Sequence, residues 1–367
     1  MLEVIFVHLL NDESGSARVL RDLIESPCFA TTDNLLVTNQ SSGFLSGIAV
    51  RYCRIFYEYR KSKIITAVFL MLAQIQLFII VTFRILMRKV SGKRTIVVIN
   101  TLLPIGAAIS AKLFSNYTIY YVHETSIRPL WYKRVLRNVV ERCADEVIFV
   151  SNYLQSVECF PKLRSHVIHN GLRGDFDAMP VIDKTKKFSN GIVVFVGSLK
   201  GYKGIYQLME IARVCPDIRF AAIFNCSHTE LSQFRSRVKF PDNLEVIVRP
   251  KDILRYFRDS LIVLNLSIPD KWIETFGLTL LEGMSYGCAV VAPPVGGHLD
   301  FVGAEHGLII DSRNTVAIVE FLKAIRSSFN MWESFSDAAV KTAEKYSSAA
   351  FQKRVSEVFL PVIERLR

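Results

Sequence analysis

Short apolar runs, many of them β-branched and separated by longer stretches with helical spacing, constrain the fold of this chain more than any other feature. Strands that are apolar on both faces and alternate with helices are typical of parallel sheets covered by helices on both sides. The sequence therefore predicts an α/β fold built from doubly wound, Rossmann-like sheets. The expected strands occupy residues 4–10, 95–100, 118–123 and 146–151 in a first group, and 192–197, 219–224, 245–250, 261–267, 289–293 and 307–311 in a second.

A polar stretch rich in glycine, lysine and aspartate, residues 170–191, separates the two groups of strands. A chain of 367 residues is also long for a single core. Two such domains would face each other across a ligand cleft at the carboxyl ends of their strands. We therefore predict an N-terminal Rossmann-like domain at 1–172, a linker at 173–190, a C-terminal Rossmann-like domain at 191–345, and a C-terminal helix at 346–367 that packs back toward the N-terminal domain.

The charge balance is basic, with 45 Lys and Arg against 34 Asp and Glu. This excess favours an anionic partner such as a membrane or a phosphorylated ligand, although a basic surface without a function is an equally simple explanation. No recognised nucleic-acid module is present, so we expect no nucleic-acid partner. The seven cysteines are scattered and odd in number, which is typical of small core residues in a reduced, cytosolic protein.

Residues 64–83 carry no charge and are flanked by basic residues on both sides. Twenty apolar residues are long enough to cross a bilayer, but Gln74 and Gln76 interrupt the run and it lies between strands of one predicted sheet. Three alternatives follow: a buried crossover helix, a helix lying in the membrane interface, or a true span. We predict peripheral contact with an anionic membrane through residues 60–94.

The sequence "FVGSLKGYKGIYQLMEIA" (195–212) predicts a strand, a glycine-rich turn and a helix. Glycines let backbone N–H groups approach a ligand closely, and the amino end of a helix suits a phosphate group. Lys203 lies at the start of the helix and adds positive charge. The alternative is an ordinary strand-to-helix turn with solvated lysines.

The stretch "ETFGLTLLE" (274–282) is apolar between two carboxylates. A helix is expected to start near Phe276, which places Glu274 in the preceding loop and Glu282 about two turns in. The N–H groups of Phe276 and Gly277 would then lie at the helix start. Carboxylates accept hydrogen bonds from vicinal diols, so the pair suits a nucleotide-sugar. The alternative is a capping Glu274 and a surface Glu282.

Together these motifs resemble the signature of the GT-B glycosyltransferases, in particular the large retaining family four, also called glycosyl transferases group one. The resemblance is carried by "ETFGLTLLEGMSYGCAVVAPPVGG" (274–297), "VGSLKGYKG" (196–204), "HNGL" (169–172), "ADEVIFVSNY" (144–153) and "SGSARVL" (14–20). The segments "HLLNDESGSARVL", "INTLLPIGA" and "VHETS" look most like enzymes that build bacterial surface polysaccharides.

The resemblance implies a set of donor-binding roles in the C-terminal domain. Glu282 would bind the ribose hydroxyls of the donor nucleotide, and Glu274 would bind hydroxyls of the donor sugar. The amides of Phe276 and Gly277 would assist Glu274. Lys203 would neutralise the donor diphosphate.

In the N-terminal domain, which would bind the acceptor, the resemblance places Gly15 beside the diphosphate and His123 near the reacting sugar carbon. His123, Glu274 and Lys203 would be the catalytic residues. Two positions depart from the family pattern: Ser198 replaces the arginine of the diphosphate loop, and Ala17 replaces the usual acidic residue of the first loop. Lys200 or another basic residue would have to compensate for the missing arginine.

The predicted function is therefore the transfer, with retention, of a hexosyl or deoxyhexosyl group from a nucleotide-sugar to a glycan acceptor. The resemblance implies no metal and no cofactor. We expect a lipid-linked acceptor in O-antigen or capsule-like polysaccharide synthesis, and a cytoplasmic protein peripheral to the inner membrane. A non-catalytic nucleotide-sugar-binding protein and a nucleotide-sugar epimerase are the alternatives on the same fold.

Overall fold

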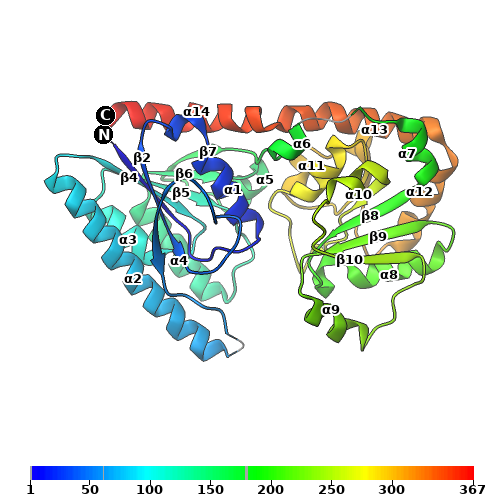
Figure 1. Cartoon of the computed structure of the whole chain (residues 1–367), viewed down its shortest axis with the longest axis horizontal. Coiled ribbons are helices and arrows are strands. Elements are labelled where there is room, and N and C mark those ends of the chain that lie inside the picture. Colours follow the sequence, from blue (N-terminus) through cyan, green and yellow to red (C-terminus); the bar gives the residue numbers. More distant parts are fainter. Residues whose placement is uncertain (1, 61, 178–180) are drawn as a thin grey trace. The chain divides into compact units, whose positions relative to one another are not determined.

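The computed structural model describes residues 2–60, 62–177 and 181–367, which form two compact units. The first unit comprises Met1–Asn170 and Ala349–Arg367, and the second comprises Gly171–Ser348. Each unit is a parallel sheet with helices packed against it (Figure 1).

The sheet of the first unit has seven strands in the order β3-β2-β1-β4-β5-β6-β7, all parallel. Its strands are β1 (Glu3–Val7), β2 (Asp33–Asn39), β3 (Arg51–Ile55), β4 (Thr95–Asn100), β5 (Tyr117–Val122), β6 (Glu146–Phe149) and β7 (Arg164–Val167). The helices of this unit are α1 (Gly15–Ile24), η1 (Pro27–Phe29), α2 (Lys63–Val90), α3 (Ile105–Phe114), α4 (Leu130–Cys143), α5 (Asn152–Val157) and α14 (Ser348–Arg365).

The sheet of the second unit has six parallel strands in the order β10-β9-β8-β11-β12-β13. These are β8 (Ile192–Gly197), β9 (Arg219–Phe224), β10 (Leu244–Val248), β11 (Ser260–Leu264), β12 (Ala289–Ala292) and β13 (Gly307–Ile309). The helices are α6 (Gly174–Asp177), α7 (Lys184–Asn190), η2 (Gly201–Lys203), α8 (Ile205–Val214), α9 (His228–Arg235), α10 (Leu254–Asp259), α11 (Leu278–Ser285), η3 (Gly297–Asp300), η4 (Ala304–His306), α12 (Thr315–Ser327), α13 (Phe329–Ala343) and η5 (Glu344–Tyr346).

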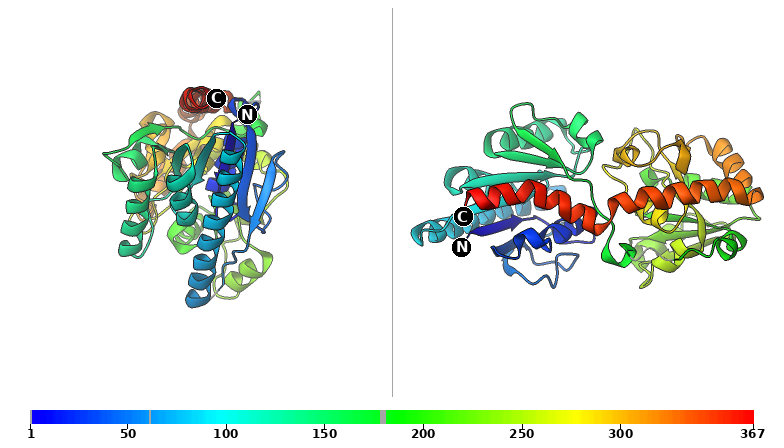
Figure 2. Two further views of the ribbon diagram at one scale, coloured as in Figure 1. Left: turned by 90° about the vertical axis from the view of Figure 1, so that its left-hand side faces the viewer. Right: turned by 90° about the horizontal axis from the view of Figure 1, so that it is seen from above.

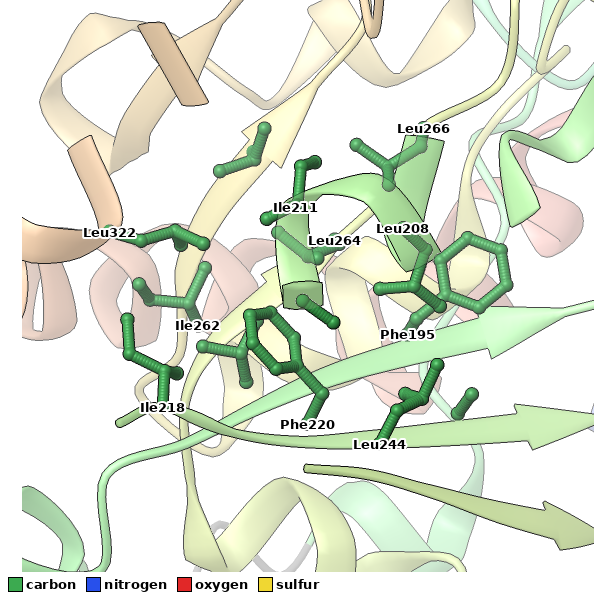
Figure 3. Close-up of a cluster of buried hydrophobic side chains, with 14 of the residues drawn as sticks. Phe195, Leu208, Ile211, Ile218, Phe220, Leu244, Ile262, Leu264, Leu266 and Leu322 are labelled. Carbon is green, nitrogen blue, oxygen red and sulfur yellow. The ribbon is translucent and has the colours of Figure 1, made fainter. Parts of the chain in front are cut away.

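A continuous apolar core joins the sheet of the second unit to the helices that cover it. Figure 3 shows Leu208 of α8 and Leu322 of α12 packed with side chains from the strands, among them Phe195, Phe220 and Ile262. Burial on this scale fixes the positions of the strand ends, because close-packed interiors do not deform easily. The loops at the carboxyl ends of β8, β11 and β12 are therefore held on a rigid base.

The sequence did not reveal β2, β3 or β7, and the predicted strands 4–10, 146–151 and 261–267 end earlier than expected. The segment 173–190, predicted as a linker, forms α6 and α7 inside the second unit, apart from residues 178–180, which lie outside the described residues. Asp183 caps α7, and Lys187 is buried with its Nζ donating to the carbonyl oxygen of Phe257 at 2.6 Å.

Helix α14 belongs to the first unit from Ala349 onward. The ring of Phe359 lies 5.0 Å from that of Phe29, which in turn contacts Phe6 of β1 at 5.1 Å. Near the end of α14, the guanidinium of Arg365 lies over the ring of Tyr117 at 4.7 Å. Helix α14 therefore packs into the same core as strand β1.

Helix α2 contains the uncharged segment 64–83. Its buried residues are Ala73, Leu77, Val81 and Ile85, which follow one another every four residues and form a single stripe. By length and composition alone, Ile64–Val90 is long and apolar enough to cross a membrane, and only 17% of its most apolar window is buried in the protein. This exposure argues against the buried crossover helix that the sequence left open. The predicted contact segment 60–94 includes residue 61, which lies outside the described residues.

Candidate functional site

The glycine-rich turn follows β8 and leads through η2 into α8. Gly204 has φ +86°, and a Cβ at this position would lie 2.1 Å from the carbonyl oxygen of Leu266. Only glycine fits there, for reasons of both conformation and space. The close approach of Gly204 to Leu266 fixes Lys203 next to the loop that follows β11.

Lys203 forms an ion pair with Glu274 through Nζ and Oε1. The Ser267 hydroxyl donates to the same carboxylate oxygen at 3.0 Å, and the Lys203 ammonium lies 4.6 Å from the centre of the Trp272 ring. Burial raises the pKa of Glu274, but the Lys203 ammonium, the two hydrogen bonds and the nearby His298 outweigh it, so the pKa lies below its ordinary value. The pair is thus ionised, and it is partly accessible, with 16% and 20% of the two side chains exposed.

The loop around Glu274 is held to the segment after β12. The N–H of Gly297 donates to the Glu274 carbonyl oxygen at 2.7 Å. Gly277 has φ +95°, and a Cβ there would lie 2.9 Å from Cβ of His298. This left-handed residue is the N-cap of α11, so the helix begins at Leu278, two residues later than the sequence predicted. Phe276 is buried just before the helix.

Glu282 lies in the second turn of α11, and only 4% of the residue is exposed. The expectation of a surface position for Glu282, kept as an alternative, is therefore wrong. Nε of Arg173 lies 3.6 Å from its Oε1, and the Arg173 guanidinium also lies over the Phe176 ring at 4.8 Å. Sequence reasoning missed Arg173, because the two charged residues are far apart in the chain.

Ser198, the position at which the resemblance expects an arginine, lies just after β8. It lines a cavity of about 340 Å³ together with Lys200, Asn225, Arg237 and other residues of α8 and α9. The lining thus includes two cations, Lys200 and Arg237, and one acid, Glu230. Lys203, Glu274 and Glu282 do not line this cavity.

In the first unit, three polar side chains meet where β1, β4 and β5 end. Asn100 Nδ2 donates to the Ser16 carbonyl oxygen at 3.0 Å and lies 3.0 Å from Nδ1 of His8, while its Oδ1 lies 2.8 Å from Nε2 of His123. A carbonyl oxygen can only accept, so the Ser16 contact fixes the orientation of the amide. His123 must therefore donate through Nε2, which leaves Nδ1 as an acceptor.

Burial lowers the pKa of both imidazoles, to about 4 for His8 and about 3 for His123. Beside them, burial raises the pKa of the Glu124 carboxyl to about 7, although the backbone N–H groups of Leu102 and His123 lower it in part. The three groups follow neighbouring strands, and at neutral pH the two imidazoles are uncharged while the Glu124 carboxyl is about half ionised.

The structure thus brings the predicted residues together in separate sets. Lys203 and Glu274 are in direct contact, Glu282 is paired with Arg173, and Asn100 links His123 to the first turn of α1, where Gly15 lies. Gly15 itself is exposed, and the space around its Cα is open. The two acids that the sequence assigned to sugar hydroxyls both lie beside cations, and their role toward a donor stays a prediction.

Comparison with known proteins decides the family. The model of the family "Glycosyl transferases group 1" matches residues 182–342, which contain the glycine-rich turn, Lys203, Glu274 and Glu282. The second unit is a glycosyl transferases group 1 domain. The predicted resemblance to this family is thereby confirmed for the second unit.

Curated relatives of the glycosyl transferases group 1 domain match it over short segments. A sucrose-phosphate synthase of Spinacia oleracea is 28% identical over 100 residues, 27% of this chain and 10% of that protein. A sucrose synthase of Melioribacter roseus is 39% identical over 88 residues, 22% of this chain and 11% of that protein. The matches thus span about a tenth of the length of these relatives.

Solved structures match over almost the whole chain. Anabaena Alr3699/HepE in complex with UDP and glucose has a TM-score of 0.78 at 16% identity, covering 97% of this chain and 99% of that one. WaaG, described as a glycosyltransferase involved in lipopolysaccharide biosynthesis, has a TM-score of 0.69 at 12% identity and covers 97% and 99% of the two chains. At these identities the likeness concerns the fold, and it confirms the predicted GT-B class with two parallel α/β sheets.

Proposed function

We propose that this protein is a glycosyltransferase that moves a sugar from a nucleotide-sugar to an acceptor with retention of configuration. The observation that supports the proposal most is the Lys203–Glu274 pair, held between the glycine-rich turn and the amino end of α11. A cation and a carboxylate at such a place can bind a diphosphate and a polyol together.

In this mechanism Lys203 exchanges its contact with Glu274 for the donor diphosphate. The exchange would release the Glu274 carboxylate to accept hydrogen bonds from the sugar hydroxyls. When the bond to the sugar breaks, negative charge develops on the leaving phosphate, and Lys203 with the N–H groups at the start of α11 stabilises it. The acceptor then attacks from the face that the diphosphate leaves, and the diphosphate takes its proton.

Glu282 would bind the ribose hydroxyls, and the Arg173 guanidinium lies beside its carboxylate. His123 presents Nδ1 as an acceptor for a sugar hydroxyl, and Asn100 keeps that nitrogen unprotonated. Lys200, two residues after Ser198, would supply the positive charge that the missing arginine would have carried.

The names of the similar structures suggest the substrates. One was solved with UDP-glucose and another is a lipopolysaccharide enzyme, so we propose a UDP-hexose donor and a lipid-linked glycan acceptor in surface polysaccharide synthesis. The sucrose enzymes among the relatives favour UDP-glucose as the first donor to assay.

The test compares donor binding and donor turnover in the wild type with those in Lys203→Met and Glu274→Gln. We expect each change to lower turnover of UDP-glucose by about a hundredfold, because one charge-assisted contact in the transition state is lost. Lys271→Met, an exposed lysine near the same loop, is the matched control. Turnover that is unchanged in both site variants would contradict the proposal.

The same assay separates the alternatives. A binding protein would bind the donor without turnover, and an epimerase would change the sugar without transferring it. Metal dependence is tested by adding EDTA or Mg²⁺ to the assay. We expect no effect of either addition.

A further inference from the structure

Three helices of the first unit, α2, α3 and α4, lie side by side on one face of its sheet, with α3 in contact with both neighbours (Figures 1 and 2). The outward side of α2 is apolar along most of its length, and α3 and the first turns of α4 also carry exposed apolar residues; we call these residues together the apolar helix face. Its exposed members are Ile64, Ile65, Val68, Met71, Leu72, Ile75, Ile79, Phe83, Leu86, Met87 and Val90 of α2, Ile109 and Leu113 of α3, and Leu130, Trp131 and Val135 of α4.

The polar residues that interrupt the apolar run of α2 are used inside the unit. Gln74 Oε1 accepts from the N–H of Gly106 on α3 at 2.9 Å, and Gln76 exchanges hydrogen bonds with the backbone of Phe56. Thr82 and Ser110 share a hydrogen bond of 2.8 Å between α2 and α3. The polar residues Gln74, Gln76 and Thr82 therefore form hydrogen bonds that hold α2 to its neighbours, and the outward side of α2 stays apolar.

The carboxyl end of α2 is fixed to the sheet by charge. Arg84 and Arg88 both pair with the buried Glu3 of β1, and Arg88 also pairs with Asp33 of β2. Breaking a buried pair leaves an uncompensated charge and destabilises a protein by several kcal/mol. These ties hold α2 flat on the unit and oppose its insertion as a separate span.

The charge around the apolar helix face is mostly positive, although α4 carries the exposed Glu141. From residue 59 to residue 123 the sequence contains no Asp or Glu, but it has nine Lys and Arg. Among the exposed ones, Lys89 lies near the carboxyl end of α2 and Lys112 lies on α3. An apolar surface bordered by cations is complementary to a bilayer with anionic headgroups.

We propose that the apolar helix face docks on an anionic lipid bilayer, with α2 lying parallel to the membrane surface. A second copy of the chain fits this face less well, because it would bring the same excess of positive charge, including Lys89 and Lys112, into the contact. The proposal stands apart from the proposed reaction, since it concerns lipid binding alone.

The first experiment is flotation of the full chain with vesicles of phosphatidylcholine, alone or mixed with phosphatidylglycerol. We expect the wild type to float with the anionic vesicles, and Ile79→Glu/Phe83→Glu to bind at least about tenfold more weakly, because two side chains would have to enter the lipid charged. The matched control is Val214→Glu/Val316→Glu, two exposed residues of the second unit, which should float like the wild type.

Tryptophan fluorescence gives an independent readout on folded protein. Trp131 is 65% exposed on α4, whereas Trp332 is fully buried and Trp272 is stacked on Tyr202. Brominated lipids in the anionic vesicles should therefore quench the wild type and leave Trp131→Phe largely unquenched.

Three results would overturn the proposal: no flotation of the wild type with anionic vesicles, equal flotation of the two double variants, or quenching that survives the loss of Trp131. Light scattering of the protein without lipid tests the alternative that a second copy of the chain covers the apolar helix face. A dimer that the Ile79→Glu/Phe83→Glu change converts to a monomer, with no flotation, would assign the face to a second copy instead.

Discussion

The cluster of His8, His123 and Glu124 predicts how the stability of the first unit changes on acidification. The pKa values of the two imidazoles fall from an ordinary 6.5 to about 4 and about 3, so the stability they contribute is present above about pH 6.5 and is lost as the pH falls. Glu124 acts in the opposite sense, because its pKa rises from an ordinary 4.5 to about 7. Its contribution is present at low pH and is lost as the pH rises through about 7.

The magnitudes follow from these values. Between about pH 7.5 and about pH 5, each imidazole should lower the free energy of unfolding of the first unit by about 2 kcal/mol, and Glu124 should raise it by about 2 kcal/mol. The cluster in the wild type thus loses about 2 kcal/mol on acidification. Glu124→Gln removes the compensating group, so this variant should lose about 4 kcal/mol.

The assay is hydrogen exchange of peptides from β4 and β5 in increasing urea, at both pH values and corrected for intrinsic exchange rates. Other carboxylates titrate in this range, but they do so equally in the two proteins, so the difference between variant and wild type isolates Glu124. Glu58→Gln, an exposed glutamate of the same unit, is the control and should behave as the wild type. An equal loss in Glu124→Gln and wild type would refute the reasoning.

Two further predictions concern the scaffold. Gly204→Ala should destabilise the second unit by at least about 2 kcal/mol, because the residue has a positive φ and its new Cβ would clash with the Leu266 carbonyl oxygen. Gly15→Ala, where the added Cβ would lie in open space, is the control. Urea unfolding of both variants measures the difference. Phe359→Ala should lower the unfolding free energy of the first unit by about 3 to 5 kcal/mol, because it leaves a cavity against Phe29. Equal thermal unfolding of Phe359→Ala and wild type would contradict the role given to α14.

Most of the central strands could be predicted because their apolar runs are local and continuous. The strands that were missed lie at or near the edge of the first sheet or carry polar residues: β2 reads "DNLLVTN" and β7 reads "RSHV". Edge strands are buried on fewer sides, so their sequences need not be apolar throughout. Hydrophobic pattern alone therefore underestimates the width of such a sheet.

The individual residues of the candidate site could be predicted from the sequence, but the ion pairs that they form could not. The glycines around Lys203 and the spacing of Glu274 and Glu282 are visible in a few consecutive residues. The partners are not, since Lys203 and Glu274 are 71 residues apart and meet only because β8 and β11 are neighbours in the sheet. Arg173 was hidden for the same reason, inside a segment whose composition indicated a linker.

The place of α14 in the first unit has a consequence for how the protein is made. Residues 1–170 leave the ribosome first, but the ring that packs on their core from α14, Phe359, is synthesised only after the second unit. At 5 to 20 residues per second, the second unit takes roughly 10 to 35 seconds to emerge in between. During that time Phe29 has no aromatic partner from α14, so the nascent first unit keeps apolar surface uncovered until α14 has been made.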